Sequence, residues 1–240
     1  MIVSIHQPAY FPWLGYFDKI IQSDIFVYLD TVQFQKNSFQ NRNKIRTSKS
    51  WIWLTVPVIT KNVLFNTPLN KIKIDNKQNW RKKHYQSISM NYRKAIHFKK
   101  YNELIEKYYT NEWEYLSDLC FEMLIDFLKI LNISTKIIKS SDMQEKNVSK
   151  NDLILQICKD LKATTYFSGK CGQDYIDEDS FNKNDINVVF QDYNHPIYNQ
   201  VYSGFEPNMG IIDLLMNELS SQTIISPQTI KKGYENKKIT

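Results

Sequence analysis

The sequence predicts an α/β fold: an open, mostly parallel sheet with helices on both faces and a helical insertion around residues 79–131. Two observations support this prediction. Short apolar, β-branched runs at 1–5 and 24–29 flank an amphipathic segment at 14–22, and strand–helix–strand order of this kind gives a parallel pair. A long helical stretch then interrupts the alternation, which resumes at residue 136.

The middle of the chain contains one more predicted strand and three predicted helices. Residues 51–58 (WIWLTVPV) form the strand, and Pro57 places it at a sheet edge or a strand end because proline cannot donate to a sheet ladder. The helices are predicted at 79–90, 97–109 and 112–131. The last has apolar residues at three- and four-residue spacing, which is typical of a buried helix face.

The strand and helix patterns return in the second half of the chain. Strands are predicted at 136–139, 163–169 and 186–193, and helices at 151–161 and 210–219. This alternation is typical of a Rossmann-like sheet. We expect a single α/β domain over residues 1–220, followed by a polar C-terminal tail at 221–240.

Composition narrows the class of protein. The net charge of +6 comes from 31 basic and 25 acidic residues scattered along 240 positions, a balance that attracts nucleotides or phosphorylated sugars. Abundant Lys and Asn indicate biased composition more than a nucleic-acid surface. No apolar run of about 18 residues and no secretion signal is found, so we expect no membrane insertion and a cytoplasmic protein. Three widely spaced cysteines fit neither a disulfide framework nor a metal site, and no metal is expected.

Glycine is scarce and clustered. Only six occur, and the five that precede the tail lie in three short segments, HQPAYFPWLGY, SGKCGQDY and SGFEPNMG. In an open α/β sheet, ligands bind outside the carboxyl ends of the strands. Because these segments follow predicted strands, we predict that they meet around one pocket, with His6 delivered by the first strand.

Several of these segments resemble a known family. Residues 6–19 (HQPAYFPWLGYFDK), 30–44 (DTVQFQKNSFQNRNK) and 53–58 (WLTVPV) resemble motifs of the WbqC-like protein family, and shorter matches extend the likeness over about 2–217. Lys170 and Cys171 depart from it, in a loop that the resemblance implies to be rich in small residues. The resemblance implies proteins encoded with bacterial surface-polysaccharide genes, O-antigen (lipopolysaccharide) in particular, and does not define a reaction.

Candidate substrate-binding residues are polar or aromatic and lie mainly in these motifs. Amides and hydroxyls in 30–44 suit sugar hydroxyls, nearby cations suit a phosphate or carboxylate, and aromatic rings suit a sugar or base. The basic start of the 79–90 helix suits a pyrophosphate. The candidates are Gln7, Tyr10, Trp13, Gln33, Ser38, Gln40, Asn41, Arg42, Asn43, Lys44, Trp53, Lys83, His84, Ser168, Gly169, Tyr175 and Gln200. A solvated polar loop and a basic solvent-exposed helix face remain the alternatives.

Two histidines are the candidate catalytic residues. His6 and His195 both follow predicted strands, and an unperturbed imidazole titrates near neutral pH. We expect His195 to approach His6 across the sheet edge, although a histidine buried for packing is the alternative for each. The sequence contains no P-loop, GxGxxG, GxSxG or HExxH motif.

Three functional hypotheses follow. The first is a transferase that attaches an acyl or aminoacyl group to the amine of a nucleotide-linked amino sugar, with His6 as general base. The second is a non-catalytic sugar- or nucleotide-binding protein, or an assembly partner of polysaccharide enzymes. The third, by loose analogy, is a nucleotidylyltransferase-like enzyme that uses ATP. Such enzymes hold the ATP phosphates with a His-x-x-His or His-x-Gly-His element, but here its second histidine is absent and Tyr16 follows Gly15.

The expected partner is a nucleotide-linked sugar or another small phosphorylated substrate, with nucleic acid a weaker hypothesis. No cofactor follows from the sequence, and ATP stays open.

Overall fold

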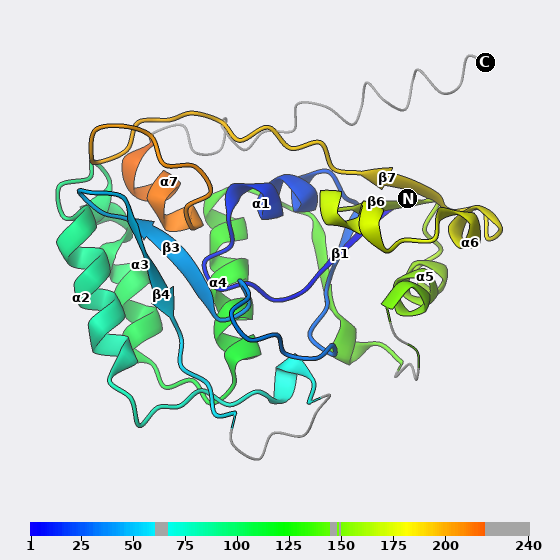
Figure 1. The fold of residues 1–240 in the computed structure, drawn as a ribbon, viewed down its shortest axis with the longest axis horizontal. Helices are drawn as coiled ribbons and strands as arrows, with labels where there is room; N and C mark the ends of the chain where they lie inside the picture. The colour runs from blue at the N-terminus through cyan, green and yellow to red at the C-terminus, as the bar shows by residue number, and fades with distance from the viewer. Residues whose placement is uncertain (61–66, 145–147, 149, 219–240) are drawn as a thin grey trace.

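The computed structural model describes residues 1–60, 67–144, 148 and 150–218. Its centre is an all-parallel sheet of five strands (Figure 1), which confirms the predicted Rossmann-like α/β fold. The strands are β1 (Ile2–His6), β2 (Ile25–Tyr28), β5 (Lys136–Lys139), β6 (Thr165–Ser168) and β7 (Asn187–Phe190). Their order is β5-β2-β1-β6-β7, so the chain builds outward from β1 in one direction and then returns to build in the other. The topological switch point therefore lies between β1 and β6.

Helices cover both faces of this sheet. One hydrophobic cluster joins Phe26 and Tyr28 to α1 (Leu14–Ile21) and α4 (Leu116–Ile130). A second cluster joins the alternate strand residues, such as Val3 and Val27, to α5 (Lys150–Asp160) and α6 (Glu178–Asn182). The two clusters form because successive strand residues point to opposite faces.

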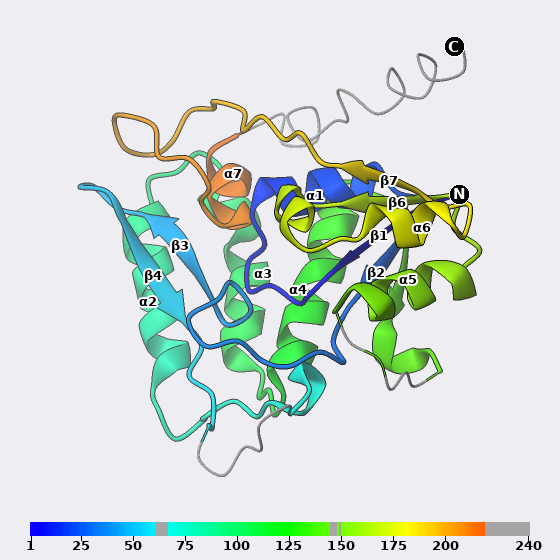
Figure 2. The same cartoon turned by 45° about the vertical axis from the view of Figure 1, so that its right-hand side comes forward.

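The last helix of the predicted insertion at 79–131, α4, covers a face of the sheet, whereas the first two helices lie to one side of it, on the left in Figures 1 and 2. These two are α2 (Trp80–Tyr92) and α3 (Phe98–Thr110), which pack with α7 (Ile211–Asn217). An antiparallel ribbon of β3 (Arg42–Arg46) and β4 (Trp51–Thr55) completes this side of the molecule. Single 3₁₀ turns form η1 (Leu69–Lys71), η2 (Ser140–Asp142) and η3 (Lys170–Asp174).

The ribbon is the main difference from the sequence prediction. The polar stretch at 30–44 runs into β3, which was not predicted. Arg42, Lys44 and Arg46 lie on one face of β3, and the other face has a single apolar residue, Ile45, so the sequence shows no apolar pattern typical of a strand. The predicted strand at 51–58 ends at Thr55, and it pairs with β3 rather than with the parallel sheet.

Helix boundaries differ by a few residues. The helix predicted at 112–131 begins at Leu116, and the short α6 was not predicted. The predicted tail at 221–240 lies outside the described residues.

A buried carboxylate joins the insertion to α7. Asp213 is fully buried, and it accepts hydrogen bonds from the Tyr92 hydroxyl (2.8 Å), the Tyr198 hydroxyl (2.9 Å) and Gln200 Nε2 (2.7 Å). Burial raises the pKa of this carboxyl above its ordinary value, although the three donors oppose that shift. Because the donors come from α2 and from the segment before α7, Asp213 fixes the position of both.

We expect Asp213→Asn to lower the free energy of unfolding by about 1–3 kcal/mol, because an amide cannot accept all the donors that face the carboxylate and leaves one unsatisfied. Urea denaturation followed by circular dichroism measures the change. The exposed Asp192 offers a matched control, since Asp192→Asn makes the same chemical change at the surface. Equal stabilities for the two variants would show that the buried network contributes nothing.

Candidate functional site

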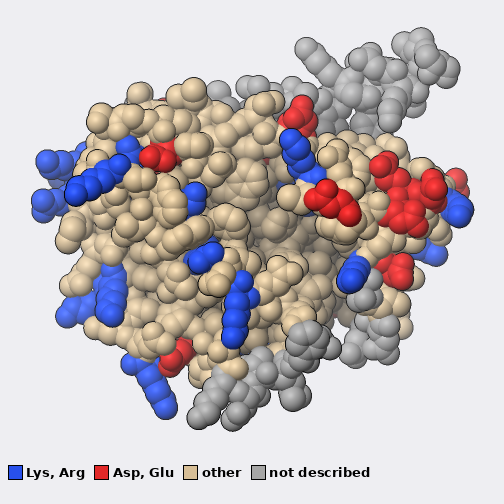
Figure 3. Space-filling model, viewed as in Figure 1, with Lys and Arg blue, Asp and Glu red and all other residues tan. Residues whose placement is uncertain are grey.

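The topological switch point brings two predicted segments together. His6 ends β1. Ser168 ends the neighbouring β6, which pairs with β1 in parallel, and Gly169 follows it. The carboxyl ends of adjacent parallel strands at a switch point are the usual ligand site of such sheets. Figure 3 shows the molecule hollowed near the centre of the view, where Figure 1 places the segment between β1 and α1. We therefore take this edge as the candidate site.

The β1–α1 segment has a fixed path across this edge. Phe11 is buried and has a positive φ of 43°. Residues other than glycine adopt this backbone conformation only where neighbouring residues hold them in it. Its carbonyl accepts from Asn43 Nδ2 (2.6 Å), while the Tyr10 amide donates to the Phe39 carbonyl (3.0 Å). The cluster of Pro, Trp and Gly in the first sixteen residues thus encodes a rigid bend rather than a loose terminus.

His6 stands at the start of this bend as a neutral imidazole. Its Nδ1 is 2.9 Å from the Gln7 carbonyl oxygen, which can only accept, so Nδ1 carries the proton and Nε2 keeps its lone pair. The Tyr16 ring packs edge-on at 4.7 Å between centroids. Burial, together with the charge of Lys19, lowers the pKa of His6 to about 4. At neutral pH, Nε2 is therefore available to accept a proton.

Lys19 is the site residue that sequence reasoning missed. It lies on the buried face of α1 with only 3% of its surface exposed, and its ammonium donates to the Ile5 carbonyl at 2.8 Å. Burial lowers the pKa of Lys19 to about 7. The signal was present in the sequence, because Lys19 follows Gly15 by four residues and Tyr16 by three, and so falls on the buried face of the predicted helix.

An amide pair connects the bend to the ribbon. Gln40 Nε2 donates to Gln7 Oε1 at 2.6 Å, and the adjacent Phe39 ring lies 5.8 Å from the Trp53 ring. Predicted residues from the opening motif and from the 30–44 motif therefore meet.

The outer face of the ribbon carries cations on aromatic rings. The Arg42 guanidinium lies 4.4 Å from the centre of the Trp53 ring, and the Lys44 ammonium lies 4.3 Å from that of Trp51. Both cations and both indoles are only partly buried. Such a face presents positive charge and flat apolar surface to a ligand. In Figure 3, Lys and Arg side chains border the hollow on its left, whereas acidic side chains gather on the right over α6.

Other predicted polar residues hold the backbone. Asn43 is buried and also accepts the Lys44 amide, and Asn41 Nδ2 donates to the Val56 carbonyl. The Ser38 hydroxyl donates to the Gln35 carbonyl, and Gln33 is exposed beside Pro68.

The remaining predicted residues of the sheet edge differ in exposure. Ser168 is buried, and its hydroxyl donates to the Gly169 carbonyl. Tyr175 is exposed just after η3. Trp13 packs edge-on against Tyr193 with ring centroids 5.4 Å apart.

His195 lies in a different environment from His6. Its Nδ1 is 2.8 Å from the Pro196 carbonyl oxygen, and its Nε2 accepts the Asn208 amide at 3.2 Å, so both ring nitrogens are used. Its ring packs against Tyr198 and Phe205, within its own loop. Gln200 binds Asp213 and the Glu206 backbone in that same loop. The structure therefore places His195 and Gln200 in the network around α7, whereas His6 contacts Gln7 and Tyr16 at the switch point.

His84 belongs to the aromatic core of the insertion. It is buried, and its Nδ1 is 3.0 Å from the Tyr10 hydroxyl, which is 2.6 Å from the Tyr109 hydroxyl. The ring also hydrogen-bonds the Thr55 backbone, while burial lowers the pKa of His84 to about 4. Its neighbour Lys83 is exposed.

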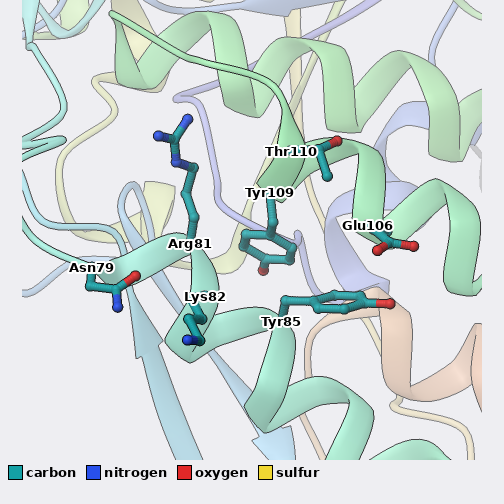
Figure 4. Close-up of a pocket in the computed structure, with 7 residues that line it drawn as sticks. All are labelled: Asn79, Arg81, Lys82, Tyr85, Glu106, Tyr109 and Thr110. Carbon is teal, nitrogen blue, oxygen red and sulfur yellow. The ribbon is translucent and has the colours of Figure 1, made fainter.

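A pocket of about 290 Å³ lies between α2 and α3, away from the switch point. Figure 4 shows the rings of Tyr85 and Tyr109 between Lys82 and Glu106. Asn79, Arg81 and Thr110 complete the lining. Because the Tyr109 hydroxyl also contacts Tyr10, the pocket wall is joined to the opening bend by one hydrogen bond.

Two features are absent from the described ranges. Within residues 1–60, 67–144, 148 and 150–218, no group of three or more His, Cys, Asp or Glu side chains could hold a metal ion. No helix in that part of the chain has the length and apolar character needed to cross a membrane. Cys120 and Cys158 are buried free thiols, and Cys171 is exposed.

Comparisons with known proteins agree on one family. The profile of the WbqC-like protein family matches residues 7–225. An uncharacterized protein of Mycobacterium tuberculosis, Rv1507c, is 36% identical over 217 residues, which cover 90% of this chain and 93% of that protein. No solved structure matches the chain.

Proposed function

The chain belongs to the WbqC-like protein family, and on that premise we propose that it is a transferase of bacterial surface-polysaccharide biosynthesis. Its proposed substrate is a nucleotide-linked amino sugar, and its reaction is acyl or aminoacyl transfer to the sugar amine. The activated acyl donor is a thioester or an acyl phosphate, the latter formed with ATP.

One observation carries this proposal: a neutral histidine lies at the switch point, and the residue after it, Gln7, hydrogen-bonds Gln40, two positions before a cationic and aromatic ribbon. His6 is neutral at physiological pH because burial lowers its pKa to about 4. The Gln7–Gln40 pair joins this base to the ribbon, where Arg42 and Lys44 suit a diphosphate and the indoles suit a sugar or base. A base beside a phosphate-binding face is what amine acylation on a nucleotide-linked sugar needs.

In the proposed step, the acyl carbon exchanges its bond to the donor for a bond to the sugar nitrogen. The sugar nitrogen forms a bond to the acyl carbon, and the bond from that carbon to the donor's sulfur or phosphate oxygen breaks with its electron pair. The nitrogen becomes an ammonium in the tetrahedral intermediate and is then strongly acidic, so a weak base suffices. His6 Nε2 accepts that proton and releases it to solvent or to the departing group.

The proposal is tested by incubating purified protein with nucleotide-linked amino sugars and either acyl thioesters or an amino acid plus ATP. Mass spectrometry is expected to show a sugar nucleotide heavier by the acyl group, and none when the substrate amine is already acetylated. Ligand-dependent thermal shifts without product across this panel would identify the chain as a non-catalytic binding protein.

We expect Trp53→Ala to weaken binding of the nucleotide-linked sugar by about tenfold or more, since a stacked aromatic contact is worth roughly 1–3 kcal/mol. Isothermal titration calorimetry measures the change. Trp113, which is also partly buried but packs against the core of the insertion, provides Trp113→Ala as the matched tryptophan control. Unchanged affinity in Trp53→Ala would remove the ribbon from the binding site.

A further inference from the structure

A buried lysine at the switch point has no anionic partner among the described residues. Among the residues that the structure describes, the Lys19 ammonium makes one hydrogen bond, to the Ile5 carbonyl, and no ion pair. An ammonium has three N–H donors, and a buried charge is costly unless it is paired. Within the described chain, two of the three donors of Lys19 therefore have no acceptor, and none has a charged one.

Gly169 keeps one side of this ammonium open. Its backbone has φ −68° and ψ 160°, an extended conformation that any residue adopts, so the backbone does not require glycine there. A Cβ atom placed on Gly169 would meet a single described heavy atom within 4 Å beyond its chain neighbours, Lys19 Nζ at 4.0 Å. The missing side chain thus leaves space directly in front of the charge, at the carboxyl end of β6.

We propose that the Lys19 ammonium is the anion-binding group of the switch point, where it receives a phosphate or carboxylate oxygen of the ligand between the ends of β1 and β6. The proposal stands on the burial of Lys19, its single carbonyl partner and the open space at Gly169. The lowered pKa of Lys19 agrees with it, because an arriving anion restores the charged form. It rests on the switch-point site of the proposed function but not on the transfer reaction, since an anion can bind whether or not turnover occurs.

The test measures anion binding without any enzyme assay. Inorganic pyrophosphate is the probe for a phosphate-bearing ligand and acetate the probe for a carboxylate, each against sodium chloride of matched ionic strength. We expect at least one of them to raise the melting temperature of the protein and to give a measurable Kd by calorimetry.

Lys19→Met keeps the aliphatic stem and removes the charge, so it is expected to weaken that binding by about 10- to 100-fold. Lys170→Met, at an exposed lysine next to Gly169, is expected to retain it. A wild-type protein that responds to neither probe would overturn the proposal, as would equal affinities for wild type and Lys19→Met.

Gly169→Val provides an independent variant that leaves Lys19 in place. Its methyl groups fill the space in front of the ammonium, so it is expected to lose anion binding to a similar degree while its circular dichroism spectrum stays native. If Lys19→Met does not fold, this variant decides the question: wild-type affinity in Gly169→Val would contradict the proposal.

Discussion

Replacing His6 with glutamine is expected to lower kcat of the proposed transfer by about 100- to 10,000-fold, the range that a positioned general base contributes. Glutamine preserves the size and neutrality of the side chain and can still contact the Gln7 carbonyl. It cannot accept a proton at the position of Nε2, which is the one property that the proposed step uses. The measurement is the rate of acyl-sugar formation at saturating substrate.

His195→Gln is the matched variant for this experiment. Both ring nitrogens of His195 already have partners, the Pro196 carbonyl and the Asn208 amide, so no lone pair is available for proton transfer. Its kcat is expected to stay at least about tenfold above that of His6→Gln. A lower kcat in His195→Gln than in His6→Gln would mean that His195, and not His6, is the base. Wild-type rates in both variants would mean that neither histidine acts as a base.

The parallel sheet was predictable because each of its strands has a local mark. MIVSI, DIFVYL and the strands near 136, 165 and 187 are short apolar runs, and the helices between them have clear periodicity. The ribbon was not predictable in the same way. RNKIR contains three cations, of which Arg46 is buried, and only one apolar residue. Its strand character therefore depends on pairing with Trp51–Thr55 and on packing of Ile45, both of which are tertiary contacts.

The site was predictable to the extent that it depends on strand ends. His6, Gln7 and Gly169 lie where the order of strands places them, and the motif at 30–44 reaches them through Gln40. The positions of His195 and Gln200 depend on the path of a long irregular segment, which strand order does not determine. Lys19 was overlooked because a lysine in a helix is usually read as exposed, although its spacing from Gly15 and Tyr16 placed it on the buried face.

Acid is expected to destabilise the protein as the pH falls from 7 to 4. The pKa values of His6 and His84 are both lowered to about 4 by burial, whereas an unfolded histidine titrates at 6.5. Between these pH values the unfolded chain binds more protons than the folded one, so the free energy of unfolding falls as pH falls. The loss amounts to roughly 3 kcal/mol for each histidine between pH 7 and pH 4.

Two buried carboxyls act in the opposite sense. Burial raises the pKa of Asp18 and Asp213 above the unfolded value of 3.8, so the folded chain binds the extra proton there as pH falls. These two carboxyls offset part of the stability lost through His6 and His84, but only in the pH range where they titrate. The pKa of His195 is also lowered, so this histidine adds to the loss of stability. Urea denaturation at a series of pH values between 7 and 4 measures the sum.

His84→Gln separates the histidine contribution from the rest. The variant loses the Tyr10 contact and is less stable at pH 7, but its stability is expected to fall less steeply on acidification because one proton-binding difference is gone. A slope equal to that of the wild type would show that His84 does not titrate in this way.

Lys19 predicts a second limb on the alkaline side of the same curve. Its pKa is lowered from 10.5 to about 7, so the unfolded chain binds the extra proton at Lys19 between these values, and the contribution of Lys19 to stability rises with pH there. The buried thiols of Cys120 and Cys158, whose pKa values are raised, oppose this contribution at the upper end of the range. Lys19→Met is expected to flatten this limb. It is also expected to make the acid limb less steep, because removal of the Lys19 charge raises the pKa of His6 toward its ordinary value. A bound anion is expected to flatten the alkaline limb of the wild type as well, since it stabilises the ammonium in the folded state. Flattening of the alkaline limb by an anion, with no matching effect of the anion on the His84 contribution to the acid limb, would distinguish the proposed ligand-binding role of Lys19 from the packing role of His84.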